Sequence, residues 1–209
     1  MTTMSAFTYD DLRKLMTLMT GDEKHEPSAT STLDALWVLY DRVLHISPAT
    51  VDDPERDRFV LSKGHGPMAY YAVLAAKGFV DPAALRTFGQ RDSVLGLHPD
   101  RRLVPGVEIG SGSLGHGLGI AVGMALALRA RRSPGRVFCL VGDAELEEGS
   151  NWEAVQLAGR LALGGLVTIA IDNGSSTHGW PGGIAMRFET EGWTSATVDG
   201  RSHRDLAAA

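Results

Sequence analysis

The sequence predicts an α/β fold of three layers, α/β/α, built on a mainly parallel sheet. Two apolar runs of strand length, at 136–142 and 165–171, flank a helical pattern at 150–162. Neither run alternates polar with apolar residues, which is typical of strands that are buried on both faces. Strand, helix and strand in this order form a βαβ unit, whose right-handed crossover places the two parallel strands close together.

Helices and one further strand are expected before this unit. Apolar spacing, or a proline at the first helical position, predicts helices over 9–19, 31–44, 67–77, 81–88 and 118–131. The last of these helices is apolar on nearly every side, so we expect it to be buried, in the interior or also at a subunit interface. RFVLS, at 58–62, is expected to form a short buried strand.

The remaining segments predict a loop, a helix cap and a further strand. The stretch 96–117 is long, irregular and rich in glycine, and long loops inside compact domains are usually functional or disordered. Ser150 and Glu153 have the spacing of a capping box. WTSATVDG, at 193–200, is a candidate for a third strand, and a helix is expected to start at Ser202.

Composition predicts a single domain over residues 1–209. This length suits one large domain. The formal net charge of −5 lacks the basic excess that is typical of nucleic-acid-binding domains. No secretory signal is recognisable, and no apolar stretch reaches the roughly 18 residues that a membrane span needs. The single cysteine, Cys139, has no partner for an intrachain disulfide, so we expect a reducing, cytoplasmic location. From the charge and the absence of a long apolar stretch, we expect neither nucleic acid nor a membrane as partner.

Polar side chains follow both apolar runs of the βαβ unit. Asp143 comes directly after the first run, and Asn173 comes at the end of the second. Ligands of such sheets bind beyond the carboxyl ends of the strands. A carboxylate and an amide oxygen suit Mg²⁺ or Ca²⁺, which in turn would hold a diphosphate. The alternative is structural: Asp143 caps a turn, and Asp172 to Gly174 is a loop after a strand.

Several motifs along the chain resemble one known family. GDAELEEGSNWEA, followed by LGGLVTIAIDN, resembles the thiamine diphosphate motif: Gly-Asp-Gly, an acidic helix start, then a strand that ends in Asn. The stretches DRFVLSKGHGPMAYYAVLAAKGF, GLHPD and VEIGSGSLGHGLGIAVGMALA narrow the resemblance. Together they cover roughly 31–200 and are similar to the amino-terminal, diphosphate-binding half of transketolase, of the kind encoded as a separate subunit.

The resemblance implies a set of residues that bind the metal ion and the cofactor. The metal ligands would be the side chains of Asp143 and Asn173 and the backbone carbonyl of Ser175. Gly112 and Leu114 would contact the aminopyrimidine of thiamine diphosphate. The whole cofactor-binding set would be Gly112, Leu114, Gly142, Asp143, Ala144, Glu148, Asn173 and His65.

The resemblance also implies catalytic residues. His65 and His98 would lie near the thiazolium and the donor substrate, and His25 matches a further active-site histidine by its spacing from Asp34. Glu148 would link paired active sites through a carboxylate network, with Glu153 as its neighbour. The structural alternative is that both glutamates stabilise a helix start and that the histidines are solvated loop residues.

The activity implied is the transfer of a two-carbon ketol unit from a ketose to an aldehyde, with sugars or sugar phosphates as substrates. The family's pyrimidine-binding domain has no counterpart in this sequence. We therefore expect a partner chain, a C-terminal transketolase-like subunit in a heterotetramer, and no activity without it. The alternatives are another thiamine enzyme subunit, similar to deoxyxylulose-phosphate synthase or an oxo-acid dehydrogenase, and a non-catalytic paralogue that stabilises a partner.

The sequence departs from the family pattern at several places. Ala144 replaces the second glycine of the motif, which matters if φ at this position is positive. GSSTHG, at 174–179, is polar where the family usually has apolar residues beside the thiazolium. The setting of His25 is KHEP instead of the usual GHPG, and the chain stops short of the family's last segments.

Overall fold

A parallel sheet forms the centre of the computed structural model, which describes residues 7–20 and 26–209. Its strands are β1 (Arg58–Leu61), β2 (Val137–Gly142) and β3 (Leu166–Ile171), in the order β1-β2-β3. Both neighbouring pairs are parallel, and Val137 of β2 is in register with Arg58 and Leu166. The strands predicted at 58–62, 136–142 and 165–171 and the βαβ crossover are confirmed.

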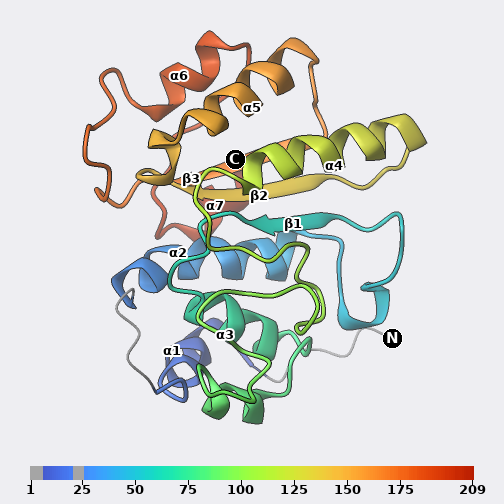
Figure 1. Cartoon of the computed structure of the whole chain (residues 1–209), viewed down its shortest axis with the longest axis vertical. Helices are drawn as coiled ribbons and strands as arrows, with labels where there is room; N and C mark the ends of the chain where they lie inside the picture. The colour runs from blue at the N-terminus through green and yellow to red at the C-terminus, as the bar shows by residue number, and fades with distance from the viewer. Residues whose placement is uncertain (1–6, 21–25) are drawn as a thin grey trace.

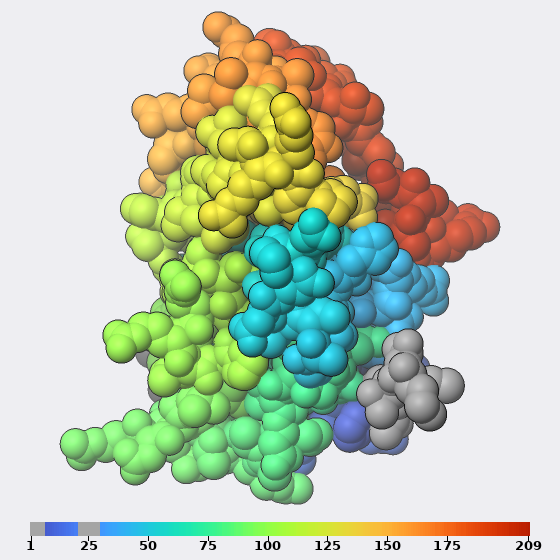
Figure 2. Space-filling view, turned by 90° about the vertical axis from the view of Figure 1, so that its right-hand side faces the viewer, coloured from blue at the N-terminus to red at the C-terminus, as the bar shows by residue number. Residues whose placement is uncertain are grey.

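Helices cover both faces of this sheet, which confirms the three-layer fold (Figure 1). One layer contains α4 (Gly117–Arg131), α5 (Gly149–Arg160) and α6 (Ile184–Thr190). The other contains α1 (Tyr9–Met16), α2 (Glu26–Val38), α3 (Met68–Ala76) and, packed against α2, α7 (His203–Ala208). Figure 2 shows the same division, with the blue and green segments below and the yellow and orange segments above.

Short helical segments extend or connect these elements. A π-helical segment, Leu39–Val43, continues α2, and 3-10 turns form at Pro48–Thr50, Pro82–Thr87 and Glu145–Glu147. The segment predicted as a helix over 81–88 is therefore a 3-10 turn, with the carboxylate of Asp81 accepting a hydrogen bond from the backbone N–H of Ala83.

The central strand explains why its sequence shows no polar alternation. Phe138 and Leu140 belong to the core on the α2 and α3 side, whereas Cys139 and Val141 belong to the core on the α4 and α5 side. Each face of β2 therefore needs apolar side chains. Burial raises the pKa of the Cys139 thiol well above its usual value, so this cysteine is an unreactive core residue.

The expected strand at 193–200 is wrong, because this segment forms no ladder in the structure. Its first residue is held by side-chain contacts instead. The indole N–H of Trp193 donates to the carbonyl of Val155 on α5 at 3.0 Å, and the Trp193 ring packs edge-on against Phe188. β-propensity measures how well a residue fits a pleated, half-buried surface and does not supply a neighbouring strand.

Helix α4 is buried on one side only within this chain, so the expectation that it lies entirely in the interior is wrong. Leu118, Ala121 and Val122 face the core. The side chain of Ile120 is 42% exposed, and a Cβ added to the exposed Gly123 would meet no other atom. An apolar helix face is therefore left open to solvent. Among the residues that the structure describes, no helix has the length and apolar character needed to span a membrane.

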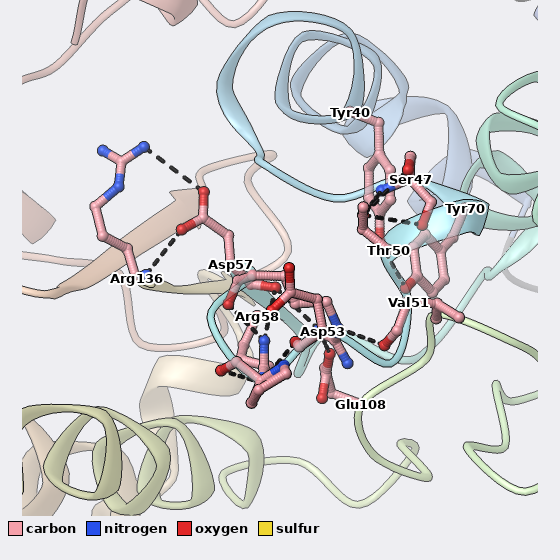
Figure 3. A network of polar contacts seen from close by, with 12 residues as sticks. Tyr40, Ser47, Thr50, Val51, Asp53, Asp57, Arg58, Tyr70, Glu108 and Arg136 are labelled. Carbon is pink, nitrogen blue, oxygen red and sulfur yellow. Dashed lines mark hydrogen bonds and ion pairs between the residues drawn. The ribbon is translucent and has the colours of Figure 1, made fainter. Parts of the chain in front are cut away.

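A buried carboxylate fixes the end of the sheet where β2 begins (Figure 3). Asp57 is 2% exposed and accepts hydrogen bonds from the backbone N–H groups of His45, at 2.9 Å, and Arg136, at 2.8 Å. Arg136 also forms an ion pair with it. Asp57 thus ties the loop after α2 to the residue that precedes β2.

Replacing Asp57 with alanine is expected to lower the free energy of unfolding by about 1–3 kcal/mol, because backbone donors lose a buried acceptor. Urea denaturation of the two proteins measures this difference. The control is Asp52→Ala, which removes an exposed carboxylate from the same loop. Equal destabilisation by the two substitutions would contradict the structural role of Asp57.

Candidate functional site

The candidate site lies where loops meet at the carboxyl ends of the strands. Segment 62–66 follows β1, 142–148 follows β2, 172–178 follows β3, and 110–116 leads into α4. Hydrogen bonds join the second of these segments to the other three. Parallel strands present their carboxyl ends at one edge, which is where ligands of such sheets bind.

Asp143 is the buried carboxylate of this edge, with an exposed fraction of 0%. Its Oδ1 accepts from the Ser175 hydroxyl at 2.5 Å, and its Oδ2 accepts from the backbone N–H groups of Ser175, at 2.8 Å, and Ser176, at 3.0 Å. Burial raises the pKa of this carboxyl, but these hydrogen bonds outweigh burial and leave the pKa below its usual value. Asp143 is therefore ionised at neutral pH.

Of the other two expected metal ligands, Ser175 contacts Asp143, whereas the Asn173 side chain contacts α2. Ser175 lies against Asp143 through the contacts just described. Asn173 is exposed, and its amide nitrogen donates to the Ser31 hydroxyl of α2 at 3.3 Å. The contact that the structure records for the Asn173 side chain is thus with α2.

The donor chemistry of these residues fits a hard divalent cation. A carboxylate, an amide oxygen and a backbone carbonyl are the oxygen ligands that Mg²⁺ and Ca²⁺ prefer. Within the described ranges, no group of three or more His, Cys, Asp or Glu side chains could hold a metal ion. Asp143 would be the single carboxylate of the site, so phosphate oxygens and water would have to complete the coordination shell.

His65 and His98 come together although they are far apart in the sequence. Their ring centroids are 5.2 Å apart, in an edge-on arrangement. The His98 ring also lies close to Gly112, where a Cβ would come within 2.7 Å of it and where φ is +129°. Only glycine tolerates this conformation and this approach without strain. His25 lies outside the described residues.

Leu114 belongs to the glycine-rich loop before α4, and the Glu148 side chain lies beside that loop. Leu114 is half-buried, and a Cβ at the next residue, Gly115, would meet the Glu148 side chain at 2.7 Å. Glu148 is the N-cap residue of α5 and is exposed, as is Glu153 one turn further along. The two carboxylates therefore lie on the surface at the start of α5.

The predicted capping box is wrong. Ser150 is the second residue of α5 instead of its cap, and its hydroxyl donates to the carbonyl of Gly115 at 2.8 Å. The serine side chain thus joins α5 to the glycine-rich loop. This tertiary contact competes with the local cap and replaces it.

The departures from the motif have structural explanations. Ala144 has a φ of −65°, so the position does not require glycine. Gly142 lies under the aliphatic part of Lys63, where a Cβ would come within 3.2 Å. The polar segment 174–179 is held by carboxylates: Ser176 donates its hydroxyl to Glu147 at 2.6 Å, and the backbone N–H of His178 donates to the same oxygen at 2.7 Å.

Glu145 is a buried residue of the site that motif analysis did not assign. It is 2% exposed, and burial raises the pKa of its carboxyl. Lys63 is buried beside it, and burial lowers the pKa of the ammonium although Asp143 and Glu145 attract its charge. The acidic cluster after Asp143 was the available signal, but nothing in it distinguishes Glu145 from Glu147 or Glu148.

A parallel sheet with helices on both faces (Figure 1), and with loops joined by hydrogen bonds at the carboxyl ends of its strands, defines a three-layer α/β domain. The family model described as "Transketolase, thiamine diphosphate binding domain" matches residues 17–209. The chain belongs to this family, which confirms the resemblance found in the sequence.

Curated relatives include single subunits of transketolases. The chain is 43% identical over 145 residues to a subunit of the apulose-4-phosphate transketolase of Actinobacillus succinogenes, a match covering 69% of this chain and 52% of the relative. It is 35% identical over 191 residues to the SqwG subunit of the 6-deoxy-6-sulfo-D-fructose transketolase of Clostridium sp., covering 88% of this chain and 70% of the relative.

Solved transketolase structures share the fold over almost the whole chain. The Leishmania mexicana enzyme matches with a TM-score of 0.78 and 26% identity, covering 97% of this chain and 34% of that one. The Campylobacter jejuni enzyme matches with a TM-score of 0.77 and 27% identity, covering 97% of this chain and 35% of that one. The chain thus corresponds to about a third of these enzymes.

A further relative has a name that implies different chemistry. "Ferredoxin fas2" of Rhodococcoides fascians is 54% identical over 204 residues, covering 97% of this chain and 67% of the relative. Iron–sulfur clusters are held chiefly by several cysteine thiolates. These 209 residues contain one cysteine, so the region shared with this relative does not supply the ligand set of such a cluster.

Asp143→Asn is expected to weaken the dependence of stability on pH in acid. Because the folded pKa of Asp143 is lowered, its ionised form stabilises the fold above the unfolded pKa of about 3.9, and this stabilisation is lost as the pH falls through the folded value. Urea denaturation across the acid range measures the slope, with Asp52→Asn as the control. If the free energy of unfolding of Asp143→Asn depended on pH as steeply as that of the wild type, the lowered pKa of Asp143 would be contradicted.

Proposed function

We propose that this chain is the thiamine diphosphate- and Mg²⁺-binding subunit of a two-chain transketolase, which transfers a two-carbon ketol unit from a ketose to an aldehyde. The observation that carries the proposal is that hydrogen bonds join the segments holding Asp143, His65 and Gly112 at one edge of the sheet, where the His98 ring lies against both His65 and Gly112. The relatives named as transketolase subunits support it.

The residues at this edge have distinct roles in the proposal. Asp143, the Asn173 side chain and the Ser175 carbonyl hold Mg²⁺, or Ca²⁺ in its place. Gly142 and Ala144 border the diphosphate, and Gly112 and Leu114 contact the aminopyrimidine. When bound, thiamine diphosphate supplies a nucleophilic carbon and stores negative charge. The protein contributes binding, orientation and proton transfer.

The histidines are the proposed proton carriers. Imidazole takes up and releases protons near neutral pH, and a positioned general acid or base contributes about 10²–10⁴-fold to the rate. The separation of 5.2 Å between the rings of His65 and His98 lets both contact one small substrate group. His25 is proposed as a third histidine of the same site.

A partner chain completes the proposed enzyme. The family's pyrimidine-binding domain would come from a C-terminal transketolase-like subunit, with residues 1–209 as one domain of a cytoplasmic heterotetramer. Assembly is proposed to use the open apolar face of α4, around Ile120 and Gly123, because contact with a partner would remove its apolar surface from water. Glu148 and Glu153 lie on the neighbouring surface of α5, where a carboxylate network between paired sites is proposed.

The proposed substrates are ketoses with or without a phosphate group. The relatives are named for apulose 4-phosphate and for 6-deoxy-6-sulfo-D-fructose. Co-purification with the partner, followed by a ketol-transfer assay on a panel of phosphorylated and free ketoses, tests the substrate class. Transfer by the purified chain alone would contradict the need for a partner.

Two substitutions separate cofactor binding from catalysis. In the assembled complex, Asp143→Ala is expected to abolish Mg²⁺-dependent binding of thiamine diphosphate, measured by calorimetry. His98→Ala is expected to retain binding while transfer falls by about 10²–10⁴-fold. Asp52→Ala is the control for both. A wild-type complex that binds no cofactor would favour the non-catalytic paralogue, and one that binds it but transfers no ketol unit would favour another thiamine enzyme.

A further inference from the structure

Glu145 accepts hydrogen bonds from two segments that are distant in the sequence and from the start of its own turn. Its Oε1 accepts from the Ser62 hydroxyl at 2.5 Å and from the backbone N–H of Gly115 at 3.1 Å. Its Oε2 accepts from the backbone N–H of Gly142 at 3.2 Å. Ser62 follows β1, Gly115 precedes α4, and Gly142 ends β2, so one carboxylate joins three loops.

These contacts are buried and depend on one another. Ser62, Gly115 and Gly142 are all buried, so a donor that loses Glu145 is left without an acceptor. The backbone carbonyl of Glu145 accepts from the Asn151 amide at 2.7 Å, which fixes the turn that carries the carboxylate. Lys63 lies beside this carboxylate, and its charge is attracted to it.

Each of the three donors lies close to a group proposed to touch the cofactor or the metal ion. Ser62 precedes His65 by three residues, and Gly142 is next to Asp143. Gly115 is next to Leu114, in the loop that contains Gly112. A shift of any of these loops would therefore move a proposed ligand-binding group.

We propose that Glu145 is a positioning residue that holds these three loops in the arrangement that binds thiamine diphosphate. This inference rests on the proposed function. Outer-shell groups that orient ligands typically change affinity by about 10–100-fold when they are removed. A carboxylate suits the position because it only accepts hydrogen bonds, whereas the NH₂ group of a glutamine would face one of the donors.

The structure offers a matched control at the other end of the same strand. Asp57 is also buried and also accepts hydrogen bonds from backbone N–H groups, but its partner Arg136 precedes β2, whereas Glu145 binds beyond the end of β2. Loss of Asp57 should therefore weaken the fold without altering the loops at the carboxyl edge. A comparison of the two separates a role in the site from general stability.

The test uses the complex with its partner chain and the variants Glu145→Ala, Glu145→Gln and Asp57→Ala. Calorimetry gives the Kd for thiamine diphosphate at saturating Mg²⁺, thermal unfolding gives Tm, and ketol transfer gives kcat at saturating cofactor. Glu145→Ala is expected to raise Kd by about 10–100-fold with kcat changed by only a few-fold. Glu145→Gln should raise Kd less, and Asp57→Ala should lower Tm at an unchanged Kd.

The outcomes distinguish this inference from the proposed function. Wild-type affinity in both Glu145 variants overturns the positioning role alone. An equal rise of Kd in Asp57→Ala at a similar Tm assigns the effect to general stability and also overturns the role. If Glu145→Ala fails to fold, Glu145→Gln decides the question. A wild-type complex that binds no thiamine diphosphate overturns the proposed function, and this inference with it.

Discussion

The arrangement of the candidate site depends on the buried carboxylates in the turn after β2. Asp143 accepts a hydrogen bond from Ser175 in the loop after β3. Glu145 accepts hydrogen bonds from Ser62, after β1, and from Gly115, before α4. Because both side chains are removed from water, their oxygens need donors from the protein. The loops supply these donors. The hydrogen bonds that the buried carboxylates require are therefore the same ones that hold the loops of the candidate site together.

At both ends of β2, buried carboxylates accept hydrogen bonds from backbone N–H groups, but the two ends differ in what these bonds hold in place. At the amino end, Asp57 binds backbone N–H groups and fixes the connection into the sheet. At the carboxyl end, Asp143 and Glu145 do the same for loops that carry the histidines and the glycine-rich segment. Placing a binding site on groups held by a rigid sheet keeps its geometry defined even though loops form its surface.

Much of the candidate site could be predicted because its signals are local. Asp143 follows an apolar run directly, and parallel strands bring such positions to one edge whatever the details of packing. The contact of Asn173 with Ser31 could not be predicted, because it joins residues 142 positions apart. For the same reason, Glu145 could not be distinguished from its acidic neighbours, since two of its donors, Ser62 and Gly115, come from other segments.

The sequence by itself determined the parallel α/β sheet and the family, because unbroken apolar runs, crossover spacing and ordered motifs are properties of short segments. The tertiary structure alone decided which segments have partners. It left 193–200 outside the sheet, exposed one face of α4, and directed Ser150 to Gly115 instead of to a helix cap. These outcomes depend on what lies next to a segment in space, and local pattern or propensity carries no information about a neighbour that the chain supplies from elsewhere.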